Sequence, residues 1–218
     1  MSRENERTIE VYNCFAEKYI KNTLLKYNED ILAAKRKEQH LQNFFLFGFS
    51  SLAKNASLFE IGSGSGDNSV FLSKEGFDVT ASDIAPAFIQ EIKKKHNKTI
   101  VFNVLTDSFQ KKYNGILCWR VFVHFTVNDA RIVLSKVFNA LENGGRFIFN
   151  AMNIEGHRST SEWLDFSGIY HLGEKRYYHY YDELELNDLI KKTGFRIVQT
   201  RYEGGSNNRK WLVYILEK

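Results

Sequence analysis

The sequence contains few cysteines and almost no proline. Its 218 residues include two cysteines, Cys14 and Cys118, and a single proline, Pro86. Two cysteines so far apart supply neither a disulfide framework nor the paired spacing of a zinc site. The sequence therefore excludes a small disulfide-stabilised secreted fold and fits a reducing compartment, which we expect to be the cytoplasm.

A long hydrophobic run and a strong excess of one charge are also missing. Residues 1–7 contain no apolar signal core, and the apolar stretch 116–125 is too short to span a bilayer and includes Arg120. The net charge is only +4, with dispersed lysines and no basic arm typical of a nucleic-acid-binding protein. We expect no membrane segment, no clear nucleic-acid partner, and a monomer or homodimer.

The composition is that of a globular domain with a large core. Hydrophobic residues make up 43% of the chain and aromatic residues 15%, and this length suits one domain. We expect a single domain over residues 1–218. Within it, residues 1–50 should form a helical lid and residues 151–180 an insertion over the substrate.

The most informative segment is a glycine-rich loop between an apolar run and a helix. Residues 58–61 suit a buried strand, and residues 67–69 can cap the following helix. Three glycines between them allow close approach of a ligand: Gly62, Gly64 and Gly66. A second strand over 77–83 ends at Asp83, whose carboxylate can accept two hydrogen bonds from a ribose diol.

The spacing of these glycines discriminates between nucleotides. A dinucleotide fingerprint is G-x-G-x-x-G, whereas this loop is G-x-G-x-G. Glu60 immediately precedes the loop, and its carboxylate would repel a pyrophosphate but suits a cationic amino group. A nicotinamide-dependent oxidoreductase is therefore the weaker alternative.

Residues 57–83 resemble motifs I and II of the class I S-adenosylmethionine-dependent methyltransferases, written E/D-x-G-x-G-x-G with an acidic residue ending the next strand. The resemblance is to the small-molecule members of types 11 and 12. It implies S-adenosyl-L-methionine as cofactor and S-adenosyl-L-homocysteine as product, with the glycines at the methionine moiety and Asp83 at the ribose. The cofactor-binding residues that we expect are Tyr12, Tyr19, Glu60, Gly62, Ser63, Gly64, Gly66, Asp83, Ile84, Asn103, Val104, Leu105 and Trp119.

The rest of the chain alternates helices and strands, which predicts an α/β fold with a Rossmann-like, doubly wound sheet of seven strands. The predicted strands are 58–61, 77–83, 99–105, 115–119, 146–150, 195–202 and 211–217. Most should be parallel, but no helix separates the last two, so they should form an antiparallel hairpin. Such a hairpin resembles the methyltransferase sheet, whereas a dinucleotide domain would continue with another crossover helix.

Residues 118–125 follow the fourth strand and should lie at the carboxyl edge of the sheet, where ligands bind. They lack the Asn/Asp-Pro-Pro-aromatic signature of enzymes that methylate exocyclic amines of bases and glutamine. Arg120 could anchor a substrate carboxylate or phosphate, or could be a surface cation. His124 could accept a proton from the nucleophile, or could be structural.

Two aromatic segments should border the same cleft. Tyr12 and Tyr19 lie on an amphipathic helix that could cover the cofactor or belong to the core. The segment 151–180 mixes aromatic residues with histidines, and could either select the substrate or form a packed cap. Its candidate substrate contacts are Trp163, Tyr170, His171 and Tyr178. No cysteine or carboxylate cluster accompanies the histidines, so we expect no metal site.

These patterns predict a methyltransferase that acts on a small-molecule acceptor by in-line attack on the sulfonium methyl group. Such a reaction needs positioning and exclusion of water more than covalent chemistry, so no fixed catalytic triad is expected. The attacking atom, oxygen, nitrogen or carbon, stays open. A protein that binds S-adenosylmethionine without transferring its methyl group is the main alternative.

Overall fold

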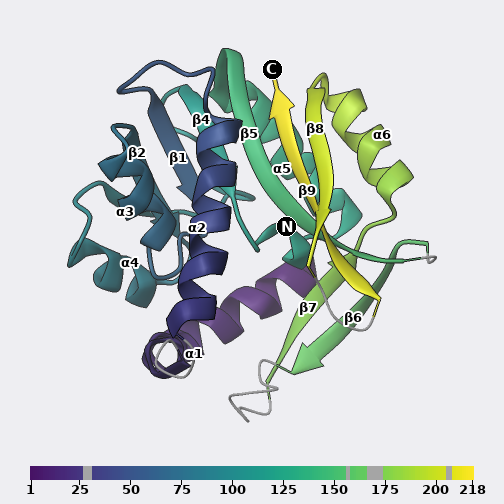
Figure 1. Cartoon of the computed structure of the whole chain (residues 1–218). Helices are drawn as coiled ribbons and strands as arrows, with labels where there is room; N and C mark the ends of the chain where they lie inside the picture. The colour runs from purple at the N-terminus through teal and green to yellow at the C-terminus, as the bar shows by residue number, and fades with distance from the viewer. Residues whose placement is uncertain (27–30, 156–157, 166–173, 205–207) are drawn as a thin grey trace.

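The computed structural model describes residues 1–26, 31–155, 158–165, 174–204 and 208–218. Within these ranges it describes the backbone throughout, and the side chains of all residues except 22–38. A sheet of nine described strands runs through the centre of the molecule, and helices cover both of its faces (Figure 1). The strands are β1 (Ser57–Ile61), β2 (Asp78–Asp83), β3 (Thr99–Val101), β4 (Tyr113–Cys118), β5 (Leu141–Ile154), β6 (Thr160–Asp165), β7 (Lys175–Tyr180), β8 (Arg196–Glu203) and β9 (Arg209–Glu217). The helices are α1 (Arg3–Lys26), α2 (Ile31–Gly48), α3 (Asp67–Lys74), α4 (Pro86–Lys93), the 3-10 turn η1 (Phe122–His124), α5 (Val127–Ala140) and α6 (Glu183–Thr193).

The predicted fold class is confirmed. Strands β3, β2, β1, β4 and β5 lie side by side in that order, and all four pairings are parallel. Strand β9 pairs antiparallel with both β5 and β8, so it runs opposite to its neighbours. The carboxyl ends of β1, β2 and β4 therefore meet at one edge, which is the edge where ligands bind in such sheets.

Two large cores hold α2, α3, α5 and α6 against the sheet, and smaller clusters hold α1 and α4. Residues Phe147 and Ile148 of β5 are both fully buried but belong to opposite cores, because successive strand side chains point to opposite faces. One core joins the strands to α5 and α6, and the other joins them to α2 and α3. The strands accordingly need apolar residues on both faces, as their continuous hydrophobic runs predict.

The structure differs from the sequence prediction around two strands. The predicted strand 99–105 ends at Val101, because the side chain of Asn103 accepts a hydrogen bond from the Leu105 backbone and turns the chain. Strand β5 continues past the predicted 146–150, because β9 pairs with it as far as Ile154.

The segment predicted as an insertion, 151–180, contributes two further strands. Strands β6 and β7 form an antiparallel hairpin, which joins the main sheet through the parallel pairing of Met152 with Tyr180. These strands raise the number from the expected seven to nine. Figure 1 shows this hairpin projecting beyond the end of the central sheet, next to α1.

Helix α1 is tied to the edge of the sheet that carries the cleft. The Tyr177 backbone N–H of β7 donates to the Thr8 hydroxyl at 3.0 Å, and the Asn5 amide donates to the His124 carbonyl at 3.3 Å. At the start of the helix, Ser2 hydrogen-bonds to the buried carboxylate of Asp129. Three separate elements therefore fix the position of α1.

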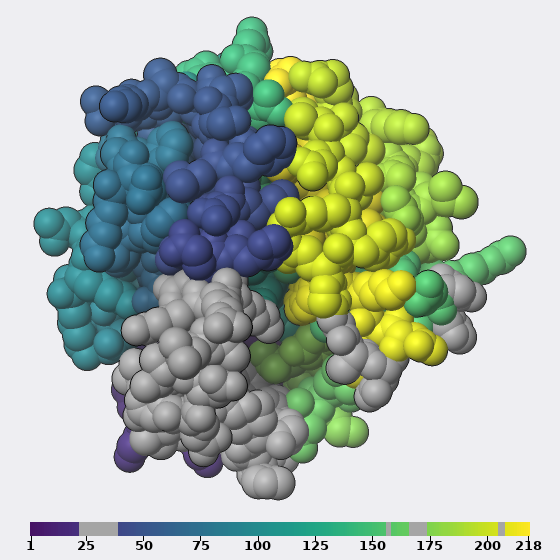
Figure 2. Space-filling model, viewed as in Figure 1, coloured from purple at the N-terminus to yellow at the C-terminus, as the bar shows by residue number. Residues whose placement is uncertain are grey.

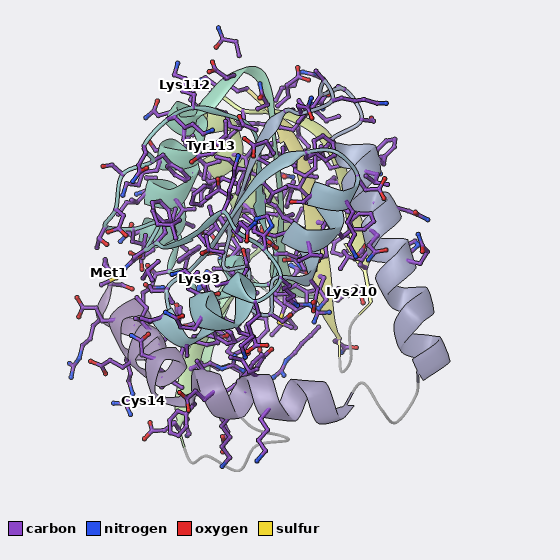
Figure 3. All side chains as sticks on the ribbon, turned by 90° about the vertical axis from the view of Figure 1, so that its left-hand side faces the viewer. Met1, Cys14, Lys93, Lys112, Tyr113 and Lys210 are labelled. Carbon is purple, nitrogen blue, oxygen red and sulfur yellow. The ribbon has the colours of Figure 1, made fainter. Side chains whose placement is uncertain are left out.

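The surface carries its charges in a dispersed pattern. Lys93, Lys112 and Lys210 lie far apart in Figure 3, as expected for lysines that belong to no common motif. Cys14 is exposed on α1, whereas Cys118 is buried at the end of β4. Among the described residues, no helix is both long and apolar enough to cross a membrane.

Candidate active site

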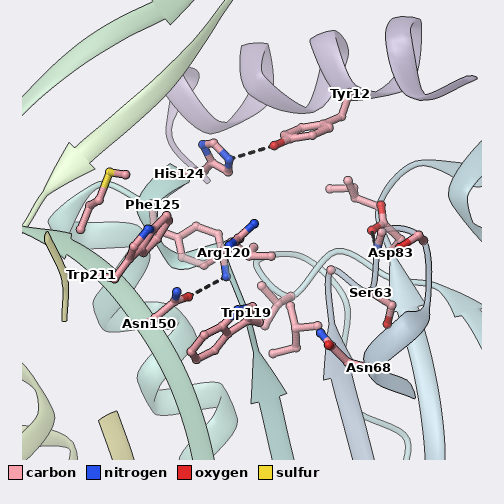
Figure 4. Close-up of a pocket in the computed structure, with 18 of the residues that line it drawn as sticks. Tyr12, Ser63, Asn68, Asp83, Trp119, Arg120, His124, Phe125, Asn150 and Trp211 are labelled. Atoms are coloured by element: carbon pink, nitrogen blue, oxygen red, sulfur yellow. Dashed lines mark hydrogen bonds between the residues drawn. The ribbon is translucent and has the colours of Figure 1, made fainter. Parts of the chain in front are cut away.

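A cleft with a volume of about 1220 Å³ lies at the carboxyl ends of β1, β2 and β4. The glycine loop and Asp83 line one end of the cleft, and Arg120, His124 and Trp211 line the other (Figure 4). Helix α2 and the β8–β9 hairpin also contribute to its lining and lie side by side on the face shown in Figure 2. Single ligand pockets usually measure about 300–1,000 Å³, so this cleft has room for more than one small molecule.

The backbone of the glycine loop requires glycine. Gly62, Gly64 and Gly66 have φ angles of 70°, 53° and 80°, in the left-handed region that side chains disfavour. A Cβ atom on Gly62 would also lie only 2.3 Å from Cγ2 of Val121. The loop therefore packs tightly against the segment after β4 while its backbone lines the cleft.

Asp83 presents a buried carboxylate to the cleft. Its Oδ2 accepts a hydrogen bond from the Gly64 N–H at 2.9 Å, and its Oδ1 accepts one from the Ala85 N–H at 3.0 Å. Burial raises the pKa of Asp83 to about 6, although these two N–H groups oppose the rise. The carboxylate is thus mostly ionised at neutral pH and keeps lone pairs for hydroxyl donors.

Glu60 lies beneath the loop instead of facing the cleft. It is 1% exposed, and its carboxylate accepts hydrogen bonds from the Ser69 hydroxyl and from the Asn68 amide. Burial raises its pKa. Asn68 itself lines the cleft, so Glu60 positions a cleft residue at the start of α3. Gly66 likewise packs behind the loop, against Ile92.

The turn after β3 divides residues 103–105, which the sequence predicts to bind the cofactor. Ile84, Asn103 and Val104 line the cleft, whereas Leu105 is buried in the core. Ser63 of the glycine loop, Trp119 and Tyr19 also line the cleft, and Tyr19 contacts Phe88 edge to face.

A hydrogen-bonded chain of three side chains reaches the other end of the cleft. Nδ1 of His124 lies 2.7 Å from the Tyr177 carbonyl, which can only accept, so Nδ1 carries the proton. Nε2 is then the acceptor, and the Tyr12 hydroxyl donates to it at 3.0 Å. Arg176 in turn donates to the Tyr12 oxygen. Figure 4 shows the Tyr12 and His124 side chains facing one another.

Burial keeps both members of this pair neutral. Burial and, to a smaller extent, the nearby Arg176 charge together lower the pKa of His124 to about 3. Burial also raises the pKa of Tyr12, against the opposing effect of Arg176. At neutral pH the imidazole is therefore uncharged and only weakly basic, with Nε2 as a hydrogen-bond acceptor, while the phenol is protonated.

Arg120 has an unusual backbone conformation. Its φ is 60°, and its backbone N–H donates to Oδ1 of Asn150 at 2.6 Å. The guanidinium lies 6.0 Å from the ring centre of Trp211, at the same end of the cleft as His124. A left-handed non-glycine residue at the floor of a cleft is a position where strain accompanies function in many proteins.

Two of the predicted substrate contacts, Trp163 and Tyr178, lie outside the cleft lining. Trp163 is 37% exposed on β6 and packs against Tyr177. Tyr178 lies behind the lining, with its ring 4.9 Å from that of His124. Tyr170 and His171 lie outside the described residues.

Several residues in or beside the cleft are not among the site residues that the sequence predicts. Asn150 ends the predicted strand 146–150, and Trp211 begins the predicted strand 211–217, so the carboxyl-edge argument could have found both. No sequence signal marks Arg176 as the partner of Tyr12, because that contact depends on the β6–β7 hairpin. Within the described part of the chain, no three His, Cys, Asp or Glu residues are grouped so that they could hold a metal ion.

Comparison with known proteins gives one family and many similar folds. A family described as "Methyltransferase domain" matches residues 32–200. No curated protein sequence matches the chain.

Three solved structures illustrate the similarity in fold. Magnesium protoporphyrin IX methyltransferase (ChlM) from Synechocystis PCC 6803, with bound SAM, is 14% identical and has a TM-score of 0.70, over 100% of this chain and 98% of that one. The 1,6-didemethyltoxoflavin-N1-methyltransferase of Burkholderia thailandensis is 16% identical with a TM-score of 0.64, over 94% and 90%. The N-methyltransferase NodS of Bradyrhizobium japonicum WM9, in complex with SAH, is 15% identical with a TM-score of 0.62, over 88% and 90%.

Proposed function

The chain belongs to the methyltransferase domain family, and from this we propose that it transfers a methyl group from S-adenosyl-L-methionine to a hydroxyl oxygen of a small organic molecule. The observation that carries the proposal is the Tyr12–His124 pair at the end of the cleft opposite Asp83. One end of the cleft has a carboxylate that can bind ribose hydroxyls, and the other end has a proton acceptor. This arrangement suits transfer of a methyl group between two bound molecules.

The residues at the Asp83 end fit the cofactor. The Asp83 carboxylate can accept hydrogen bonds from two ribose hydroxyls, and the glycine loop leaves space where any Cβ would intrude or strain the backbone. Asn103 and Val104 are suitably placed for the adenine edge. Similar folds were crystallised with SAM or SAH, which supports the same choice.

The Tyr12–His124 pair supplies a route for the acceptor's proton. The Tyr12 hydroxyl accepts from Arg176 and donates to His124, so an acceptor hydroxyl bound beside Tyr12 would meet a hydrogen-bonded chain that leads to Nε2 of His124. As the acceptor oxygen bonds to the methyl group it becomes a strongly acidic oxonium. Its proton then moves to Tyr12 while the tyrosine proton moves to Nε2 of His124, which is a weak base but a stronger one than the methylated oxygen. The cofactor supplies a methyl group on a sulfonium, whose positive charge is lost as the methyl leaves. The imidazole gains one positive charge, so the total charge of the site is unchanged.

The choice of a small acceptor rests on the size and enclosure of the cleft. Helix α1 crosses one side of it, and the β6–β7 hairpin packs against this helix through Tyr177 and Thr8. We propose that residues 1–50 act as the lid and 151–180 as the substrate cap of one domain. Among the similar folds, the named acceptors are magnesium protoporphyrin IX and 1,6-didemethyltoxoflavin, both small molecules.

The test is release of S-adenosylhomocysteine, measured by mass spectrometry with a panel of hydroxylated aromatic and heteroaromatic compounds. We expect product with a subset of the panel and a mass gain of one methylene on the acceptor. Calorimetric binding of both sulfur cofactors should accompany it. Cofactor binding without turnover of any acceptor would favour the non-catalytic binding protein, and absence of cofactor binding would overturn both.

A further inference from the structure

The cleft contains a cation that the Tyr12–His124 pair does not use. Three arginines line the cleft, and two of them have acidic partners: Arg201 pairs with Glu203, and Arg209 with Glu162. The described residues give Arg120 no such partner. Arg120 is exposed to the cleft, and a guanidinium there without a neutralising carboxylate favours an anionic ligand.

The position of Arg120 is maintained against a backbone penalty. A left-handed conformation costs a residue with a Cβ roughly 1–2 kcal/mol, and Arg120 has a φ of 60°. The Arg120 backbone N–H compensates by donating a hydrogen bond to Oδ1 of Asn150, a residue that is 1% exposed. Figure 4 shows the result: Arg120 lies on the same side of the cleft as Trp211 and His124, away from Asp83.

A second donor lies next to Arg120 in the chain. Nε1 of Trp119 is buried and has no hydrogen-bond partner in the part of the chain that the structure describes. The residue is 8% exposed and lines the cleft. Buried N–H groups are nearly always paired in native proteins, which makes this N–H, in a residue that lines the cleft, a candidate donor to a ligand oxygen. A carboxylate has two oxygens and could satisfy both donors.

The surroundings of this end of the cleft are apolar. Trp211, Phe125 and Met152 line it beside Arg120, and the indole of Trp211 packs close to the guanidinium. Aromatic walls with one charged group select an apolar ligand body that carries a single anionic group.

We propose that Arg120 and the Trp119 N–H bind a carboxylate of the acceptor, and that Asn150 positions Arg120 for this contact. The acceptor is then a hydroxylated organic acid, with its acid group at Arg120 and its hydroxyl at Tyr12. This inference rests on the proposed function, because it assigns the acceptor to the same cleft.

The test compares matched acids and amides on the full chain loaded with S-adenosylhomocysteine. The probes are 4-hydroxybenzoate against 4-hydroxybenzamide, and 4-hydroxycinnamate against 4-hydroxycinnamamide, with tryptophan fluorescence as the binding readout. We expect at least one acid to bind tenfold or more tightly than its amide. The Arg120→Gln variant should lose this preference and Arg120→Lys should keep part of it. The matched control Arg209→Gln should keep all of it, because Arg209 is already paired.

A second variant separates binding from folding. Arg120→Gly removes the guanidinium and also relieves the left-handed backbone, so its thermal midpoint should rise while the acid preference disappears. Equal binding of acids and amides, no saturable binding of either acid, or an undiminished preference in both variants would overturn the inference. Turnover of neutral acceptors alone would overturn it while leaving the proposed function intact, whereas failure to bind the sulfur cofactors would overturn the proposed function itself.

Discussion

The two ends of the cleft are built in different ways. The Asp83 end is built mainly from backbone groups and short side chains of one stretch of sequence, 60–84, in which Ser63 donates its N–H to the Ser82 carbonyl at 2.7 Å, with Asn103 and Val104 added from the turn after the next strand. The Tyr12 end uses long side chains from four distant segments, and one of its hydrogen bonds joins residues 164 positions apart. The first end is thus specified locally, and the second exists only once the whole chain has folded.

The largest effect should follow from Tyr12→Phe, which tests whether catalysis belongs to the Tyr12 end alone. Removing the hydroxyl interrupts the proton route, so kcat should fall about 10²–10⁴-fold, while the dissociation constant of S-adenosylmethionine changes little. Steady-state kinetics and calorimetry measure the two quantities. Tyr202→Phe serves as control, since Tyr202 lines the same cleft but donates to Glu183. A large loss of cofactor affinity in Tyr12→Phe would mean that the two ends are not separable.

Asp83→Ala should have the opposite effect, with weaker cofactor binding and a nearly unchanged kcat. Loss of charge-assisted hydrogen bonds worth about 1.5–3 kcal/mol each should weaken cofactor binding roughly 100-fold. At saturating cofactor, kcat should stay within a few-fold of wild type. Asp78→Ala is the matched control, because Asp78 begins the same strand but forms an exposed ion pair with Lys98. Equal weakening by both variants would argue against a ribose contact at Asp83.

The glycine loop offers a comparison within the cofactor end. Gly62→Ala combines a left-handed backbone with overlap on Val121, so its free energy of unfolding should fall by about 2–5 kcal/mol. Gly64→Ala has the same backbone problem but no atom within 4 Å of the added Cβ, and should lose only about 1–2 kcal/mol. Urea denaturation of both variants measures the difference. Equal losses would show that backbone strain, and not packing, sets the requirement.

The smallest effect is a pH dependence that should distinguish the two ends. The Asp83 carboxyl has a pKa of about 6, so it is ionised above that pH and accepts from the ribose. As pH falls through 6 it becomes protonated, and cofactor affinity should decline by at most tenfold per pH unit. His124, with a pKa of about 3, stays neutral throughout. Calorimetry between pH 5 and 8 should give a slope for wild type and a flat line for Asp83→Asn; a slope in both would point to another group.

The same contrast explains what the sequence could predict. The fold class, the antiparallel terminal strands and the placement of Gly62 and Asp83 at a cleft follow from local patterns of apolar residues, glycines and a strand-ending acid. The role of Glu60 could not be read from its position before the loop, because its burial under α3 depends on packing. The contact of Arg176 with Tyr12 could not be predicted for a further reason. It requires the register of the β6–β7 hairpin, which lies in a segment without clear periodicity.

The family match covers residues 32–200, so Tyr12 precedes the matched segment and Trp211 follows it. The matched segment contains Gly62 and Asp83 but also Arg120 and His124, and the flanking parts add Tyr12 and Trp211 to the end where we propose that the acceptor binds. Under the proposed function, substitutions at Tyr12 and Trp211 would alter the acceptor end while leaving the glycine loop and Asp83 as they are, whereas exchange of the whole of α1 would also replace Tyr19, which lines the cleft against Phe88.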